Sequence, residues 1–316
     1  KPQGTGTSQP LMHRSTLVSL ITADALRATI RALGILRDVR SSGLSLPRSL
    51  RGQNNVTSLR IELNLLRGLG DLRIPVSTTR ENSARSERLD SLVALLPQER
   101  PLRWIAEQLS DGVETKLGAK LRGELVATDE MAMRSLEEKL ARQLGTAAPL
   151  NRALEILNEE SASWRLLEGS TLANRLIADH GFADTYGQAR KRARTLLKDQ
   201  AAGGRNGPKA RDVKALLRWH DSLEAQLGAV ASATKVSPEF RDLQNHLSAL
   251  RTLQCRWLGL ARLGRVPGLK EAGSDSLRQT LVDTQKRLSV KLLMSLQRCY
   301  GPSKSNFRGL IESELA

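Results

Sequence analysis

The chain has 316 residues, enough for one large domain or two of ordinary size, and its 40% hydrophobic content suffices for a sizeable core. The formal net charge of +16 favours an anionic partner, and no apolar run approaches the roughly 20 residues of a membrane span. Two cysteines, Cys255 and Cys299, are too few for a disulfide framework or a cysteine metal site, so we expect buried thiols in a reducing compartment.

The composition predicts an all-α fold. Leu, Ala, Arg and Glu favour helices, whereas aromatic residues, which favour strands, make up only 3% of the chain. Arginine outnumbers lysine, and its planar fork of donors suits phosphate oxygens.

Residues 1–14 are predicted to form a flexible arm, and residues 15–168 a first helical half. Apolar residues at a 3.6-residue period predict its helices at 15–40, 56–69, 85–97, 100–122, 128–144 and 148–168. We expect the second of these to end near Gly68, Gly70 and Pro75. The polar stretch 77–88 is compatible with a loop or with the start of a helix.

Residues 169–316 are predicted to form a second helical half. It begins with a basic pair of helices joined by a glycine-rich connector, at 182–220. Ser237-Pro238-Glu239 then favours a helix start, giving a helix to about residue 263. A long C-terminal helix at 276–300 and a short one from Asn306 complete the chain, and the pairs 15–70 and 209–263 resemble a weak internal duplication.

The basic pair carries its cations at helical spacing. Between Asp184 and His220 there are ten Lys or Arg against three acids, so most of these cations cannot be neutralised locally. A solvated face is the alternative interpretation, but similar spacing recurs in the first half. The candidate polyanion contacts are Arg27, Arg31, Arg60, Arg190, Arg194, Lys198, Arg211, Lys214 and Arg218.

Several segments match, in order, the motifs of one known family. Tyr186 and Arg190 fall where that family has Tyr-Arg-Arg-Gly-Arg, and residues 207–216 where it has His-x-x-Arg-Lys-x-x-Lys-x-Leu, with Arg211 and Lys214 on the last two cations. Further matches are the leucine spacing from Leu243, the C-terminal Tyr300, Lys304 and Phe307, and Asp24-x-x-Arg27-x-x-x-Arg31 in the first half.

In these segments the chain resembles the CHAD family, the conserved-histidine α-helical domain. The resemblance implies two similar helical halves around a basic central groove that binds inorganic polyphosphate. Asp24 and Gly207 stand at the family's histidine positions, Ala210 replaces an arginine, and Arg251-Thr252 replaces His-Asp. The resemblance is therefore to a divergent member that lacks the signature histidines.

The resulting hypothesis is a non-catalytic, cofactor-free, cytoplasmic protein whose partner is polyphosphate, located at polyphosphate granules if that polymer is the ligand. Two alternatives remain. The chain is a helical nucleic-acid-binding protein, or it is a scaffold whose basic face binds an acidic protein. Single-stranded nucleic acid usually needs aromatic platforms, and Trp219 and Trp257 lie on apolar stripes. None of the four histidines has metal-ligand spacing, and we expect His220 to be structural or at the surface.

Overall fold

A computed structural model describes residues 9–41, 53–76, 78–94, 122–123, 125–127, 130–131, 147–168, 170, 172, 176–201, 207–233, 235–263 and 275–314. Every regular element in these ranges is helical, which confirms the predicted all-α fold. None of the described helices is long and apolar enough to cross a membrane. The α-helices are α1 (Gln9–Ser41), α3 (Gln53–Asp71), α4 (Thr79–Ala94), α7 (Ala147–Glu168), α9 (Phe182–Ala201), α10 (Ala210–Ala233), α11 (Pro238–Leu263), α13 (Asp275–Tyr300) and α14 (Lys304–Glu314), with a 3₁₀ turn η1 (Ile74–Val76) and a π turn η2 (Ile177–Gly181).

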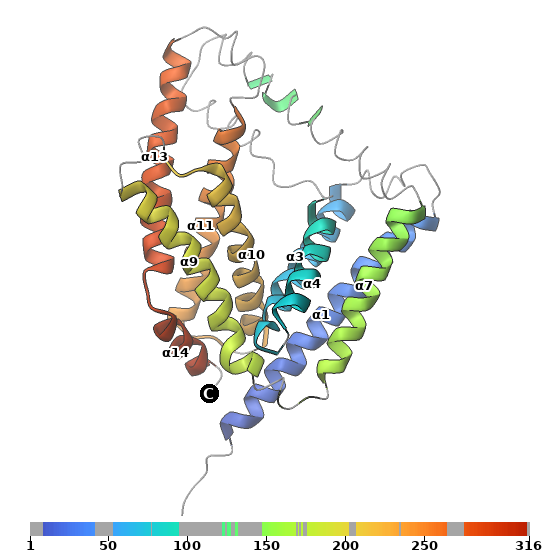
Figure 1. The fold of residues 1–316 in the computed structure, drawn as a ribbon. Coiled ribbons are helices and arrows are strands. Elements are labelled where there is room, and N and C mark those ends of the chain that lie inside the picture. Colours follow the sequence, from blue (N-terminus) through green and yellow to red (C-terminus); the bar gives the residue numbers. More distant parts are fainter. Residues whose placement is uncertain are drawn as a thin grey trace, which may run out of the picture.

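The two central helices are α3 and α10, which pack against each other (Figure 1). On one side α1 packs against both α3 and α7, and on the other α10 packs against α9 and α11. Helix α13 covers α9 and α11, and α14 packs on α9. The molecule is therefore a row of helices with the α3–α10 contact at its centre.

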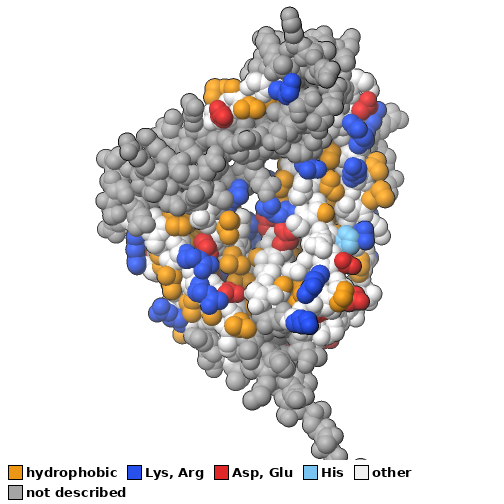
Figure 2. Space-filling model, turned by 180° about the vertical axis from the view of Figure 1, so that it is seen from behind, with side chains coloured by type: hydrophobic (Ala, Val, Ile, Leu, Met, Phe, Trp, Pro, Cys, Tyr) orange, Lys and Arg blue, Asp and Glu red, His pale blue; other side chains and the backbone are white. Residues whose placement is uncertain are grey.

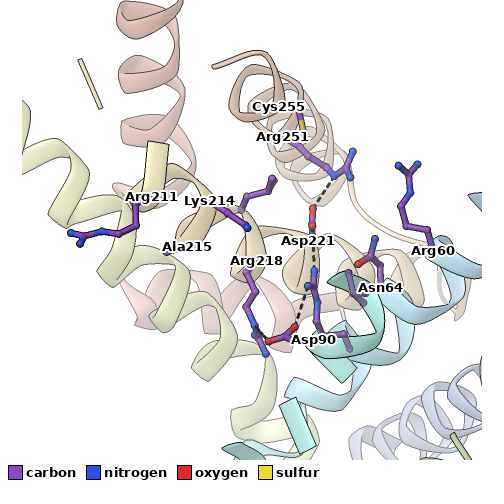
Figure 3. Close-up of a pocket in the computed structure, with 13 residues that line it drawn as sticks. Arg60, Asn64, Asp90, Arg211, Lys214, Ala215, Arg218, Asp221, Arg251 and Cys255 are labelled. Atoms are coloured by element: carbon purple, nitrogen blue, oxygen red, sulfur yellow. Dashed lines mark hydrogen bonds and ion pairs between the residues drawn. The ribbon is translucent and has the colours of Figure 1, made fainter. Parts of the chain in front are cut away.

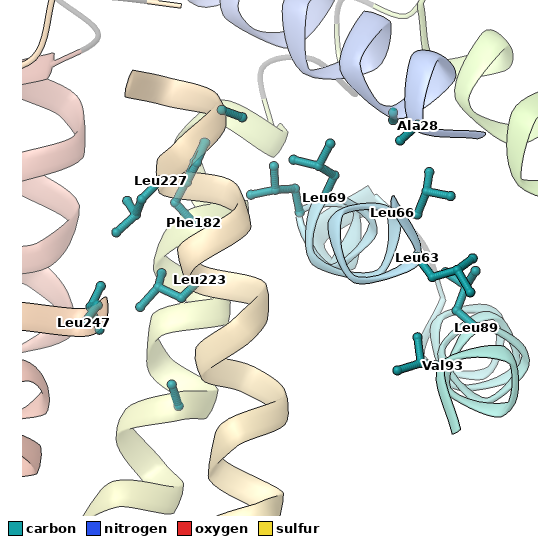
Figure 4. Packing of buried hydrophobic residues seen from close by; sticks show 14 of the residues in the cluster. Ala28, Leu63, Leu66, Leu69, Leu89, Val93, Phe182, Leu223, Leu227 and Leu247 are labelled. Carbon is teal, nitrogen blue, oxygen red and sulfur yellow. The ribbon is translucent and has the colours of Figure 1, made fainter. Parts of the chain in front are cut away.

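The core is one cluster of aliphatic side chains that follows this row. Leu66, Leu69 and Leu72 of α3 and its following turn are fully buried, and each contributes about 1.5–3 kcal/mol through burial. In Figure 4, Leu63 points toward Leu89 and Val93 of α4. Burial on several sides is what the leucine-rich sequence of α3 requires.

Two helices begin earlier than the sequence pattern predicts. Helix α1 starts at Gln9, so residues 9–14 are helical and not part of a flexible arm; Pro10 is compatible with this because its missing N–H is not needed in a first helical turn. Helix α4 starts at Thr79 and not at residue 85. There the Thr78 hydroxyl accepts from the Glu81 N–H at 3.2 Å, and the Glu81 carboxylate accepts from the Thr78 N–H at 2.9 Å, a reciprocal cap.

The other boundaries agree closely with prediction. Helices α7, α11 and α13 begin and end within one residue of the expected 148–168, 238–263 and 276–300. The predicted helices at 100–122 and 128–144 lie almost wholly outside the described residues. Helix α3 ends at Asp71, next to Gly70 as expected, and Gly68 lies inside its last turn.

Candidate functional site

A cavity of about 460 Å³ lies between α3, α4, α10 and α11. Figure 2 shows Lys and Arg side chains beside Asp and Glu in a hollow near the middle of one face. The residues around the cavity are mostly charged: Arg60, Asn64, Arg67, Asp90, Val93, Arg211, Lys214, Ala215, Leu217, Arg218, Asp221, Arg251 and Cys255. Six cations thus face two carboxylates, an excess of four positive charges among the described lining residues.

The deepest cations of the cavity belong to a chain of ion pairs that joins α3 and α4 to α10 and α11 (Figure 3). Arg67 is 8% exposed and lies 3.3 Å from both Asp90 and Asp221. Asp221 also accepts from Arg251 Nε at 2.9 Å. Arg218 forms two hydrogen bonds with Asp71, at 2.6 and 3.2 Å. Buried arginines at this interface are therefore held in place by carboxylates from both sides.

Donor capacity remains within the cavity in spite of these pairs. The Nε of Arg67 is buried and has no hydrogen-bond acceptor, and Arg218 Nε lies 3.8 Å from Asp90, too far for a hydrogen bond. Lys214 has no carboxylate partner among the described residues. Arg211 Nε donates to Asp212 at 3.2 Å, but the guanidinium is 86% exposed, and in Figure 3 it extends away from the other ion pairs. These groups leave N–H donors for an external anion.

Four of the nine predicted contacts line the cavity: Arg60, Arg211, Lys214 and Arg218. Their helical spacing on α10 places the last three on one face, as expected. Sequence reasoning missed Arg67 and Arg251. Arg67 lies seven residues after Arg60 on α3, so the same spacing rule gives the signal for it, and Arg251 stands where the CHAD motif has a histidine.

The predicted contacts Arg27 and Arg31 of α1 do not line this cavity. Arg27 pairs with Asp24 on its own helix, and Arg31 donates to both oxygens of Glu62 at 2.6 and 2.8 Å. The hydrogen bonds to Glu62 raise the pKa of Arg31. Both arginines therefore have carboxylate partners within the protein.

The three predicted contacts on α9 also lie outside the cavity lining. Arg190 donates to the carbonyl oxygens of Tyr300 and Gly301, at 3.1 and 3.2 Å, where α13 ends. Its charge thus stabilises a helix C-terminus, where the helix dipole favours cations. Arg194 and Lys198 are exposed on α9.

His220 has the structural role expected from its sequence context. It is completely buried, its Nδ1 lies 2.7 Å from the Tyr300 hydroxyl, and its Nε2 lies 2.8 Å from the carbonyl oxygen of Leu247. A carbonyl can only accept, so Nε2 carries the proton and Nδ1 accepts from Tyr300. Burial lowers the pKa of His220 to about 3, so the ring is neutral at physiological pH.

The described residues contain no group of three His, Cys, Asp or Glu side chains that is suited to hold a metal ion. Neither Cys255, which lines the cavity, nor the buried Cys299 is part of a disulfide. No family model, no curated protein and no solved structure matches the chain. The resemblance to the CHAD family stays a prediction.

Proposed function

We propose that this chain binds inorganic polyphosphate, or a similar polyanion, in the cavity between α3, α4, α10 and α11, without catalysing a reaction. The observation that carries the proposal is the meeting of six Lys or Arg side chains around one cavity with only two carboxylates in its lining. Three helices supply these cations. We also propose that the two halves of the sequence form the two walls, since α3 and α4 precede residue 169 and α10 and α11 follow it.

The chemistry of the lining fits a chain of phosphates. A guanidinium offers parallel N–H donors that match two oxygens of a phosphate, and several arginines in a row match a repeating anion. The described lining residues include no Phe, Tyr or Trp, so the cavity offers no platform on which a base could stack. This favours a phosphate polymer over single-stranded nucleic acid.

Charge reversal at the cavity tests where the polymer binds. We expect the double variant Arg211→Glu/Lys214→Glu to bind long-chain polyphosphate at least about tenfold more weakly at 0.1 M salt, because four charge units change beside the ligand. Both side chains are exposed, so the fold should persist. The measurement is the Kd of the full chain by titration calorimetry.

The matched control is Lys286→Glu/Arg287→Glu on α13, which changes the net charge equally at two exposed positions away from the cavity. Its effect should be less than about threefold at 0.1 M salt, where charges are screened over ~10 Å. Equal weakening by both doubles would contradict binding in the cavity. Undetectable binding of polyphosphate to the unaltered protein would contradict the proposal itself.

Competition separates polyphosphate from nucleic acid. Polyphosphate should displace bound single-stranded RNA of equal charge more readily than RNA displaces polyphosphate, and both affinities should fall with salt as counterions are released. The opposite order of displacement would favour nucleic acid as the ligand.

A further inference from the structure

A second cavity, of about 370 Å³, lies between α4, α7 and η1. None of the residues around it lines the first cavity. Its lining combines charged residues with apolar ones: Val76, Leu89, Ile156, Leu166 and Leu167. Its size is within the range of small-molecule sites, about 300–1,000 Å³.

Among the charged lining residues, the buried Glu160 lies between the buried Arg73 and the partly buried Arg85. Glu160 is 4% exposed and accepts hydrogen bonds from Arg85 Nε and Nη2, both at 2.8 Å, and from Trp164 Nε1 at 2.8 Å. Arg73 Nη1 lies 3.6 Å from the same carboxylate, beyond hydrogen-bond distance. The carboxylate of Glu160 is thus already occupied by Arg85 and Trp164.

Arg73 therefore lacks a full partner. It is 8% exposed; its Nη2 donates to the Ser163 hydroxyl, but its Nε and Nη1 have no acceptor. Burial, and then the charge of Arg85, lower the pKa of Arg73 to about 10. The cluster of Arg73, Arg85 and Glu160 carries one more positive than negative charge, and buried N–H groups without acceptors, such as Nε and Nη1 of Arg73, are costly.

The other charged residues around this cavity are engaged elsewhere. Arg88 pairs with Glu159, and the carboxylate of Glu81 caps the start of α4 through Thr78. The described lining is thus balanced in charge, three arginines against three glutamates, and what the buried cluster lacks is acceptors for Nε and Nη1 of Arg73. A dianion would also meet the carboxylates of Glu81 and Glu159.

We propose that this second cavity binds a small amphipathic monoanion, a carboxylate on an apolar chain, with the carboxylate on Arg73 and the chain along the leucines. Because Nε and Nη1 of Arg73 are shielded from solvent, the guanidinium must turn toward the cavity when it binds. Leu166 lines the cavity and is 81% exposed, so the apolar chain of the ligand would shield this leucine from solvent.

Octanoate is the probe for this site, tested by calorimetry on the full chain. We expect it to bind at least about tenfold more tightly than acetate, which lacks the chain, and than 1-octanol, which lacks the charge. Octyl phosphate, a dianion of the same length, should bind more weakly than octanoate. Equal binding of octanoate and 1-octanol would contradict the role of Arg73, and tighter binding of octyl phosphate would contradict the choice of a monoanion.

Two variants locate the probe. Arg73→Gln should lower octanoate affinity about tenfold, but its buried site can also affect folding, so a surface variant is needed. Leu166→Glu places a negative charge at the cavity and should lower the affinity for octanoate severalfold without loss of protein stability. Leu172→Glu, which alters a leucine that is 68% exposed outside the cavity lining, is the matched control. Equal octanoate affinities of the two glutamate variants would overturn the proposed site.

Discussion

At the scale of single residues, His220 makes stability depend on pH in a predictable direction. Its pKa is about 3 in the fold against 6.5 in the unfolded chain, because burial disfavours the charged ring. The unfolded chain therefore takes up a proton first as pH falls. The contribution of the neutral ring is complete above pH 6.5 and is lost progressively between pH 6.5 and 3, by about 3 kcal/mol at pH 4.5.

The variant His220→Gln removes this titration. At pH 7 the free energy of unfolding of this variant should be about 1–3 kcal/mol lower than that of the original chain, because Leu247 and Tyr300 lose a buried hydrogen-bond partner. At pH 4.5 the difference should shrink or reverse, since only the original chain is penalised by the proton. Urea unfolding at both pH values measures this, and a constant difference would contradict a neutral buried ring.

At the scale of elements, the crossing of α3 and α10 depends on Gly68. A Cβ built at this position would lie 2.6 Å from Ala225 Cβ and 3.1 Å from the backbone of Ser222, closer than the two helices allow. Its carbonyl also accepts from Gln226 Nε2 at 2.8 Å. We expect Gly68→Ala to lower the free energy of unfolding by about 1–3 kcal/mol through overpacking.

Gly34 of α1 provides the matched control, since a Cβ at this position meets nothing within 4 Å. Gly34→Ala should raise the free energy of unfolding by up to about 1 kcal/mol, because alanine is the better helix former. Thermal and urea unfolding of both variants measure the two effects. Changes of the same sign would mean that helix propensity, and not packing, decides the outcome at Gly68.

Gly68 also shows how far sequence alone predicts the helices. Apolar periodicity predicts α7, α11 and α13 closely, because each buries one stripe that the 3.6-residue spacing marks directly. Glycine is harder to interpret than an apolar stripe. Its low helix propensity indicates the end of a helix, whereas the close approach of another helix can require a glycine within the helix. Which of the two holds depends on α10, more than 140 residues later, so local pattern could not decide it.

The start of α4 lies in the stretch 77–88, which apolar periodicity leaves open as a loop or the start of a helix. The polar stretch that holds it contains Thr78 and Glu81 at the spacing of a reciprocal cap. This motif precedes the apolar residues by several positions, so a method based on apolar periodicity alone places the helix start too late.

At the scale of the whole molecule, the candidate site was predictable only where one helix supplies it. Spacing on α10 indicates that Arg211, Lys214 and Arg218 share a face, and they line the cavity. Arg190 has equally regular spacing, yet its partners are carbonyls 110 and 111 residues away. The partner of Arg218, Asp71, is similarly distant. Such pairings arise from helix packing, which the charge pattern of one segment does not contain.

The ion-pair chain across the cavity contains one carboxylate that competes with the proposed ligand. Asp90 is 40% exposed, lines the cavity, and is held only at 3.3 Å by Arg67 and 3.8 Å by Arg218. Asp90 is the exposed member of this pair, and the buried Arg67 keeps Asp221 as a partner without it, so the pair contributes less to stability than a fully buried one. Its negative charge nevertheless lies among the cations that an incoming phosphate must reach.

We therefore expect Asp90→Asn to bind polyphosphate more tightly, by about 1 kcal/mol or roughly fivefold, while its stability changes little. Asp221→Asn should behave differently: this carboxylate is 14% exposed and joins the buried Arg67 to Arg251, so its loss removes two ion pairs at once. Arg67 keeps Asp90 and Arg251 keeps Glu224, but we expect a larger loss of stability than for Asp90→Asn. Urea unfolding and polyphosphate titration of both variants measure the contrast. If Asp90→Asn bound no more tightly than the original chain, the phosphates would not lie beside Arg67 and Arg218, and the proposed position of the ligand would be wrong.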